Sequence, residues 1–147
     1  MANTDENRRT TLSRLDRFWL AAAGVGLLGL LATAAVLRPS PSGHGTHQQL
    51  GLPPCTFSVL FHRPCPTCGM TTAWAHLMRG EWLAACRTNA GGALLGVLAI
   101  VAAPWLLGSA IRGRWLGVAP SERAAAWISA IVMLVTMIDW AIRLLAC

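Results

Sequence analysis

Residues 91–111 read GGALLGVLAIVAAPWLLGSAI, an apolar run of 21 residues without a charged side chain. Because an α-helix rises about 1.5 Å per residue, a run of this length crosses the roughly 30 Å hydrocarbon core of a bilayer. Two similar runs flank it, FWLAAAGVGLLGLLATAAVL at 18–37 and AAAWISAIVMLVTMIDWAIRLLA at 124–146. The sequence therefore predicts an all-α membrane protein with three transmembrane helices.

The overall composition supports a membrane protein. Hydrophobic residues make up 54% of the 147 residues and charged residues only 12%, which is about half the charged fraction of an average soluble protein. This excludes a water-soluble enzyme with a closed core, and a disordered chain. The net charge of +6 comes from twelve arginines and no lysine. They flank the apolar runs and form no basic helix, so we expect them to mark topology beside the lipid bilayer, and we expect no nucleic-acid partner.

The distribution of arginine predicts the orientation in the membrane. The N-terminal tail and the 112–123 loop together carry seven arginines, whereas the longer 38–90 connection carries four. By the positive-inside rule, the N-terminus is cytoplasmic in a multi-pass protein of the cell (inner) membrane. The predicted segments are a polar cytoplasmic tail (1–17), a transmembrane helix (18–37), an extracytoplasmic connection (38–90), a second transmembrane helix (91–111), a cytoplasmic loop (112–123) and a third transmembrane helix (124–146).

Two features inside the predicted spans suggest helix contacts. Ala22, Gly26, Gly29 and Thr33 form a stripe of small residues on the first span, along which a membrane partner or a second copy of the chain could approach closely. In the third span, Asp139 and Arg143 are four residues apart, which favours an ion pair within one helix. The sequence Ala32-Thr33-Ala34 resembles a signal-peptide cleavage site, but the first run is longer than a signal peptide's apolar region, so we expect it to be retained.

The 38–90 connection divides into two parts. Residues 38–54, RPSPSGHGTHQQLGLPP, are rich in proline, glycine and serine and predict an extended linker in which His44 and His47 have no role. Residues 70–87 predict a short amphipathic helical segment at the membrane interface, because Arg79 and Glu81 at its centre disfavour a crossing. Trp74 and Trp82 are its expected interfacial anchors.

The cysteine motif between these parts carries the chemistry of the chain. Cys65 and Cys68 belong to the sequence Cys-Pro-Thr-Cys-Gly, in which Gly69 allows a positive φ after the second cysteine. Three explanations remain open: a structural disulfide or tight turn, a redox pair in which Cys65 attacks and Cys68 resolves, or a site for zinc or another thiophilic metal. Cys55 and His62 are the nearest candidates to complete a metal site with Cys65 and Cys68.

These motifs resemble a bacterial membrane family known as domain of unknown function 2752. Its pattern is C-x-F, P-C-P-x-C-G-x-T, R-G-[DE] and N-P, and the matching residues here begin at Cys55, Pro64, Arg79 and Asn89. Two departures from this pattern are that Thr72 stands where the family often has arginine and that alanine replaces proline after Asn89. The resemblance implies a small bacterial protein with several spans, and it implies no activity.

Three hypotheses for the function follow. The leading one is a non-enzymatic membrane subunit or scaffold in which the cysteine loop is structural, since the sequence offers no general acid–base constellation. The alternative is a membrane thiol–disulfide oxidoreductase that uses Cys65 and Cys68. The third is a metal-binding module. Asn89, directly before the second span, is expected to cap its helix.

Overall fold

The computed structural model describes residues 11–117 and 119–145, in which all regular elements are helices apart from one isolated bridge between Thr11 and Arg114. Residues 1–10 of the predicted cytoplasmic tail lie outside the described residues, and so does Cys147. The helices are α2 (Arg14–Val36), the 3-10 helix η1 (Thr46–Leu50), α3 (Thr56–Phe61), α4 (Met70–Leu77), α5 (Trp82–Thr88), α6 (Ala90–Arg112) and α7 (Glu122–Leu145).

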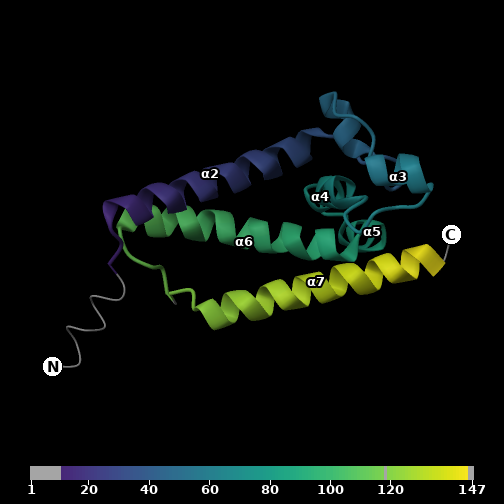
Figure 1. The fold of residues 1–147 in the computed structure, drawn as a ribbon. Helices are drawn as coiled ribbons and strands as arrows, with labels where there is room; N and C mark the ends of the chain where they lie inside the picture. Colours follow the sequence, from purple (N-terminus) through teal and green to yellow (C-terminus); the bar gives the residue numbers. More distant parts are fainter. Residues whose placement is uncertain (1–10, 118, 146–147) are drawn as a thin grey trace.

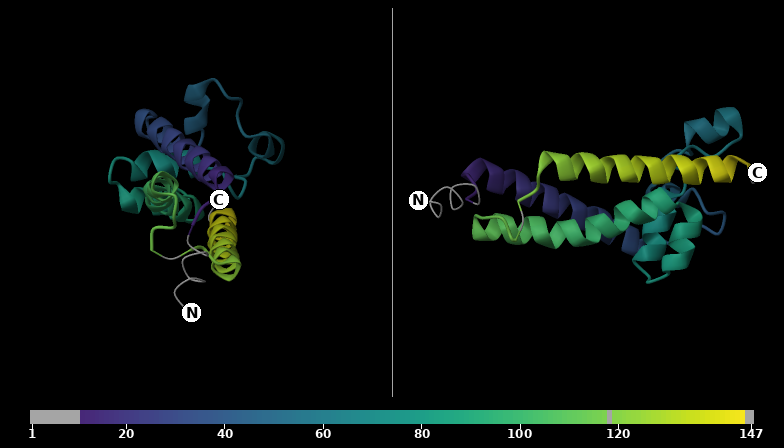
Figure 2. Two further views of the ribbon diagram at one scale, coloured as in Figure 1. Left: turned by 90° about the vertical axis from the view of Figure 1, so that its left-hand side faces the viewer. Right: turned by 90° about the horizontal axis from the view of Figure 1, so that it is seen from below.

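Three of these helices are long and apolar enough to cross a membrane, which confirms the predicted all-α fold class. Figure 1 shows α2, α6 and α7 extending along the same direction, with the short helices α3, α4 and α5 gathered at one end. The views in Figure 2 place the start of α2 and the α6–α7 loop at the opposite end. The cysteines among the described residues therefore all lie at one end of the three long helices.

Helix α2 begins four residues before the predicted apolar run because Ser13 caps it. The Ser13 hydroxyl accepts a hydrogen bond from the Asp16 backbone N–H at 3.1 Å, and the Asp16 carboxylate accepts one from the Ser13 backbone N–H at 3.0 Å. This reciprocal arrangement is a capping box, which satisfies two backbone donors at the start of the helix. At the same end, the Arg17 guanidinium donates to the carbonyl of Ala110 at 2.8 Å and so joins α2 to the end of α6.

Close packing of α2 on α6 depends on Gly24. A Cβ atom at this position would lie 2.7 Å from Cγ of Leu107 and 3.3 Å from the backbone oxygen of Ala103. Leu31 extends the contact by packing against Ala99 and Ala103. The predicted small-residue stripe faces elsewhere: its members are exposed, and a Cβ on Gly26 or Gly29 would meet nothing within 4 Å. A partner on that stripe stays a prediction.

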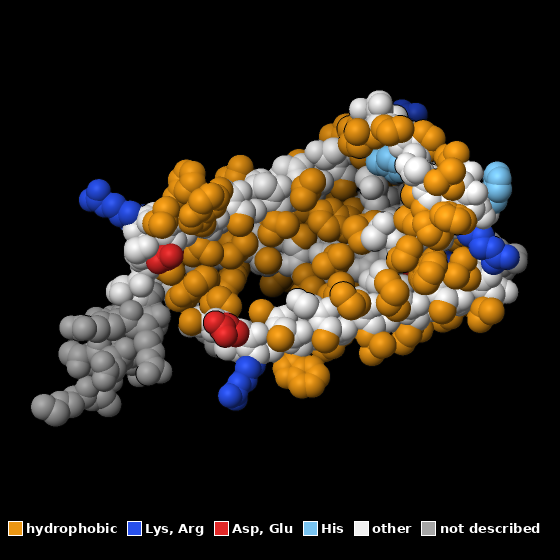
Figure 3. Space-filling model, in the orientation of Figure 1, with side chains coloured by type: hydrophobic (Ala, Val, Ile, Leu, Met, Phe, Trp, Pro, Cys, Tyr) orange, Lys and Arg blue, Asp and Glu red, His pale blue; other side chains and the backbone are white. Residues whose placement is uncertain are grey.

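Helix α7 touches the rest of the chain along a narrow face. A Cβ atom on Gly91 would collide with Thr136, so the glycine permits the close approach of α6 and α7. Most of the large apolar side chains of α7 are exposed, including Trp127 at 71% and Met133 at 67%. Figure 3 shows hydrophobic side chains spread over the long helices. Because a water-soluble protein rarely exposes so large an apolar surface, this surface is suited to lipid.

The structure corrects two expectations for residues between the first two long helices. Residues 38–54 do not form an extended linker: the stretch contains η1, and Thr46 within it is fully buried. The Gln49 side chain holds the two ends of this loop together through hydrogen bonds to the backbone N–H and carbonyl of Arg38. The indole N–H of Trp74 donates to the carbonyl of Gly92 at 2.8 Å and so joins α4 to α6. Trp74 is therefore not a free interfacial anchor.

The contact at Gly24 makes a prediction about stability. Replacing Gly24 with leucine overfills the α2–α6 interface, and we expect a loss of about 1–3 kcal/mol in the free energy of unfolding. The matched control is Gly26→Leu, because that position is on the same helix and opens onto free space. Thermal unfolding of both variants in detergent, followed by circular dichroism, measures the difference. Equal losses for the two variants would contradict the packing described here.

Candidate functional site

The cysteine loop is a tight turn that leads directly into α4. The backbone N–H of Cys68 donates to the carbonyl of Cys65 at 3.0 Å, and that of Met70 donates to the carbonyl of Thr67 at 3.1 Å. Gly69 has φ +88°, which confirms the positive φ expected for the Cys-Pro-Thr-Cys-Gly motif. A Cβ atom there would also lie 2.7 Å from the backbone oxygen of Gly43. Gly69 therefore allows both the turn and the close approach of the 38–54 loop.

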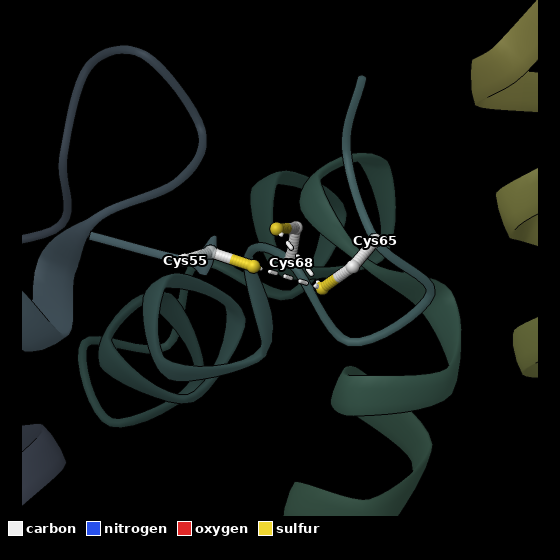
Figure 4. A group of neighbouring side chains, drawn as sticks. All are labelled: Cys55, Cys65 and Cys68. Carbon is white, nitrogen blue, oxygen red and sulfur yellow. Dashed lines mark hydrogen bonds between the residues drawn. The ribbon is translucent and has the colours of Figure 1, made fainter. Parts of the chain in front are cut away.

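This turn brings three thiols together. The Sγ atoms of Cys65 and Cys68 are 3.1 Å apart, those of Cys55 and Cys65 are 3.6 Å apart, and all three lie within 4.8 Å of one another. Figure 4 shows the three side chains pointing toward a common point. Cys55 comes from the residue before α3, whereas Cys65 and Cys68 come from the turn before α4. Cys86 is exposed on α5 and does not belong to this group.

The environment makes the two cysteines of the turn unequal acids. Burial opposes ionisation of Cys65, but hydrogen bonds from the Thr67 hydroxyl, the Cys68 and Cys55 thiols and the Thr67 backbone N–H outweigh it, so its pKa is lowered. Burial raises the pKa of Cys68 to about 12, and the hydrogen bond that its thiol shares with Cys65 adds to this effect. Cys65 is therefore the more acidic thiol of the pair, and Cys68 is the thiol that shares a hydrogen bond with it.

Asn89 fixes this turn to the start of α6. Its side-chain oxygen accepts a hydrogen bond from the Gly92 backbone N–H at 2.6 Å, which confirms the predicted cap. Its second role could not be predicted from the sequence: the side-chain amide group donates to the carbonyls of Cys68 at 3.0 Å and Pro66 at 3.2 Å. Asn89 is fully buried, so both ends of the amide are satisfied within the protein.

Arg143 holds the same two carbonyls from the side of α7. Its guanidinium donates to the oxygen of Cys68 at 3.0 Å and to that of Pro66 at 3.2 Å. Its Nε atom lies 2.9 Å from the carboxylate of Asp139, which confirms the predicted ion pair. The indole N–H of Trp140, also on α7, donates to the carbonyl of Pro64 at 2.8 Å. A cation thus lies beside the cysteine turn although Thr72 occupies the position where the family often has arginine.

The histidines are distributed differently from the expected ligand set. His62, the predicted fourth ligand, ends α3 with φ 52° and is exposed, and it is not part of the group of ligand atoms within 4.8 Å. His76 pairs with Glu81 and is not part of this group. His44 and His47, expected to have no role, line a cavity of about 300 Å³ together with all three cysteines. The sequence could not show this, because a loop of 17 residues has no periodicity that places its side chains.

The fold and the site define a class: a small helical membrane protein with one thiol cluster at the end of its long helices. Residues 55–103, about a third of the chain, match the family described as "Protein of unknown function (DUF2752)". The resemblance given by the motifs is thereby confirmed for this segment, which contains the three clustered cysteines, α4, α5 and the first half of α6. No curated protein and no solved structure matched the chain.

The unequal acidity of the two thiols predicts a pH-dependent order of modification. With its lowered pKa, Cys65 forms a thiolate at lower pH than an unperturbed cysteine, whereas Cys68 stays protonated up to a pH of about 12. In the reduced protein with a chelator present, iodoacetamide should therefore modify Cys65 first as the pH rises, and Cys68 last. Peptide mapping by mass spectrometry at a series of pH values measures the order.

Replacing Cys68 with alanine removes one of the donors to the Cys65 thiolate. The modification of Cys65 by iodoacetamide should therefore begin at a higher pH. Cys86→Ala is the matched control, because Cys86 lies outside the thiol group, and it should leave the profile in place. Preferential modification of Cys68 in the unmodified chain would contradict the described environment.

Proposed function

We propose that this membrane protein binds one thiophilic metal ion, foremost zinc, through Cys55, Cys65 and Cys68. The observation that carries the proposal is the convergence of three sulfurs within 4.8 Å of one another. Zinc–sulfur bonds are about 2.3 Å long, so the sulfurs of a tetrahedral site are roughly 3.8 Å apart. The Cys55–Cys65 distance of 3.6 Å is close to that value and the Cys65–Cys68 distance of 3.1 Å is shorter, and three thiols in one group suit a shared ion better than a single disulfide pair.

The surroundings of the thiols support a preorganised site. The turn is held by two side chains from different long helices, Asn89 and Arg143, so that little conformational freedom is lost when an ion binds. The lowered pKa of Cys65 favours the thiolate that a metal requires, whereas Cys68, whose pKa is raised to about 12, would lose its proton as the ion binds. Soft thiolate ligands select zinc, Cu(I) or iron–sulfur clusters over hard cations such as magnesium.

A structural role for this ion agrees with the hypothesis of a non-enzymatic membrane subunit or scaffold. The three thiols belong to two separate segments, one before α3 and one before α4. An ion shared between them would fasten these segments at the end of the long helices. Such a site would present a rigid loop to a membrane partner, which could also contact the exposed stripe on α2.

The thiol site is proposed to face the extracytoplasmic side of the inner membrane, with the N-terminus in the cytoplasm. The excess of arginine in the tail and in the 112–123 loop supports this orientation. The start of α2 and that loop also lie together, at the end of the long helices away from the thiols (Figure 1). In an oxidising compartment, a bound metal would protect the thiolates from oxidation.

Metal analysis tests the proposal directly. The full chain, purified in detergent under reducing conditions and loaded with zinc, should retain about one ion per chain after gel filtration, as expected for a closed thiolate site. Cys65→Ser should lose the ion. Cys86→Ser is the matched control and should retain it, since Cys86 lies outside the group of three. A wild-type chain that retains no zinc, Cu(I) or iron, or equal retention by both variants, would refute the proposal.

A second candidate function, thiol–disulfide exchange, is favoured by the opposite pKa shifts of Cys65 and Cys68. The Cys65 thiolate would attack a disulfide of a substrate protein, forming a mixed disulfide and releasing one substrate thiolate. Cys68, after losing its proton, would then displace the second substrate thiolate and form the Cys65–Cys68 disulfide. The substrate disulfide is thereby reduced to two thiols. A reduction potential below about −300 mV would identify the pair as a structural bridge instead.

The orientation makes its own prediction. Variants that retain only Cys55 or only Cys65 should react in intact cells with a membrane-impermeant maleimide, after mild reduction and chelation. A variant with a single cysteine in place of Ser121, in the predicted cytoplasmic loop, is the matched control and should react only after lysis. The reverse pattern would invert the topology and place the thiol site in the reducing cytoplasm.

A further inference from the structure

The cavity beside the three thiols is covered by one turn of the 38–54 loop. Its wall includes His44 and His47 from this turn and the three cysteines from the other side. Both histidines lie outside the segment that matches the family, and His62, the histidine nearest to the motif in sequence, is not part of this wall. These two imidazoles therefore share one cavity wall with all three thiols of the proposed metal site.

The turn is anchored, so its histidines have defined positions. Thr46, between the two histidines, is fully buried, and its hydroxyl shares a hydrogen bond of 2.8 Å with that of Thr72 on α4. The same hydroxyl accepts a hydrogen bond from the backbone N–H of Ser40 at 3.0 Å. Helix α4 begins two residues after Cys68, so Thr46 links the turn to the element that carries the thiols.

The hydrogen bond of His47 sets the nitrogen that is free to bind a metal. Nε2 of His47 lies 3.1 Å from the carbonyl oxygen of Pro53, which accepts only, so the neutral ring carries its proton on Nε2 and a lone pair on Nδ1. Histidines that bind metals almost always donate their other ring N–H to such an oxygen. Pro53 is two residues from Cys55, and His47 is half-buried, whereas His44 is exposed. His44 makes a similar contact, with Nδ1 2.8 Å from the carbonyl oxygen of Ser42, so it is the burial of His47 and the place of Pro53 beside Cys55 that favour His47 over His44.

We propose that His47 supplies the fourth ligand of the thiolate site through Nδ1 and completes a tetrahedral Cys₃His zinc centre. This inference rests on the proposed metal-binding function and extends it. The imidazole lies outside the group of sulfurs within 4.8 Å, so its ring turns toward the thiols when the ion binds. Four protein ligands leave no open position, and closed sites are structural. The ion would then fasten the 38–54 loop to the cysteine turn.

Cobalt(II) binding to the full chain in detergent tests this ligand set. Cobalt replaces zinc in such sites, and its visible absorption reports the number and type of ligands. The wild-type chain should give the intense bands of tetrahedral S₃N coordination. His47→Gln keeps an amide N–H for the carbonyl of Pro53 but has no Nδ1. We expect it to weaken cobalt binding by more than about 100-fold, since loss of even an outer partner costs 10- to 100-fold.

The controls are His44→Gln and His62→Gln, which should bind cobalt as the wild type does. Far-ultraviolet circular dichroism of each variant with a chelator shows whether it folds, and His47→Cys, which offers a fourth sulfur, should restore tight binding with an S₄ spectrum. Unchanged binding in His47→Gln, or a loss in His44→Gln alone, would overturn the role of His47. If the wild type binds no cobalt, both this inference and the proposed function fail.

Discussion

The arrangement of the site depends on two backbone carbonyls, those of Pro66 and Cys68. Each accepts a hydrogen bond from Asn89 at the start of α6 and another from Arg143 near the end of α7. An unpaired carbonyl buried in this position would cost about 1–3 kcal/mol, and donors from two helices satisfy both carbonyls here. The geometry of the three thiols is thus a consequence of how two membrane-spanning helices end.

This constraint explains why charged and polar residues are tolerated close to the apolar spans. Arg143 lies on a helix whose other side chains largely face outward, yet its charge is paired with Asp139 and its remaining donors bind loop carbonyls. The two side chains are only partly buried, and pairing leaves neither charge uncompensated. Placing an ion pair near the membrane costs free energy, and the hydrogen bonds from Arg143 to the turn offset this cost. The ordered turn holds Cys65 and Cys68 at a fixed spacing.

Much of the fold could be predicted from the sequence because it depends on local patterns. Apolar runs of sufficient length define the three long helices, the spacing of Asp139 and Arg143 predicts their ion pair, and Asn89 before an apolar run predicts a cap. The positive φ of Gly69 follows from its position after Cys68. Each of these features requires knowledge of only a few neighbouring residues.

The features that were missed depend on contacts between distant segments. Arg143 and Cys68 are 75 residues apart, and no periodicity reveals that the end of α7 returns to the turn. The 38–54 stretch has the composition of a linker, but the buried pair of Thr46 and Thr72 folds it over the thiols. Proximity in sequence therefore favoured His62 as a ligand, whereas the fold places His44 and His47 at the cavity.

The central claim is that three sulfurs from two segments form one metal site. X-ray absorption at the zinc edge of the zinc-loaded full chain counts these ligands directly. The account predicts three sulfurs at about 2.3 Å and one nitrogen at about 2.0–2.1 Å. A zinc ion surrounded by nitrogen and oxygen, with one sulfur or none, would contradict it.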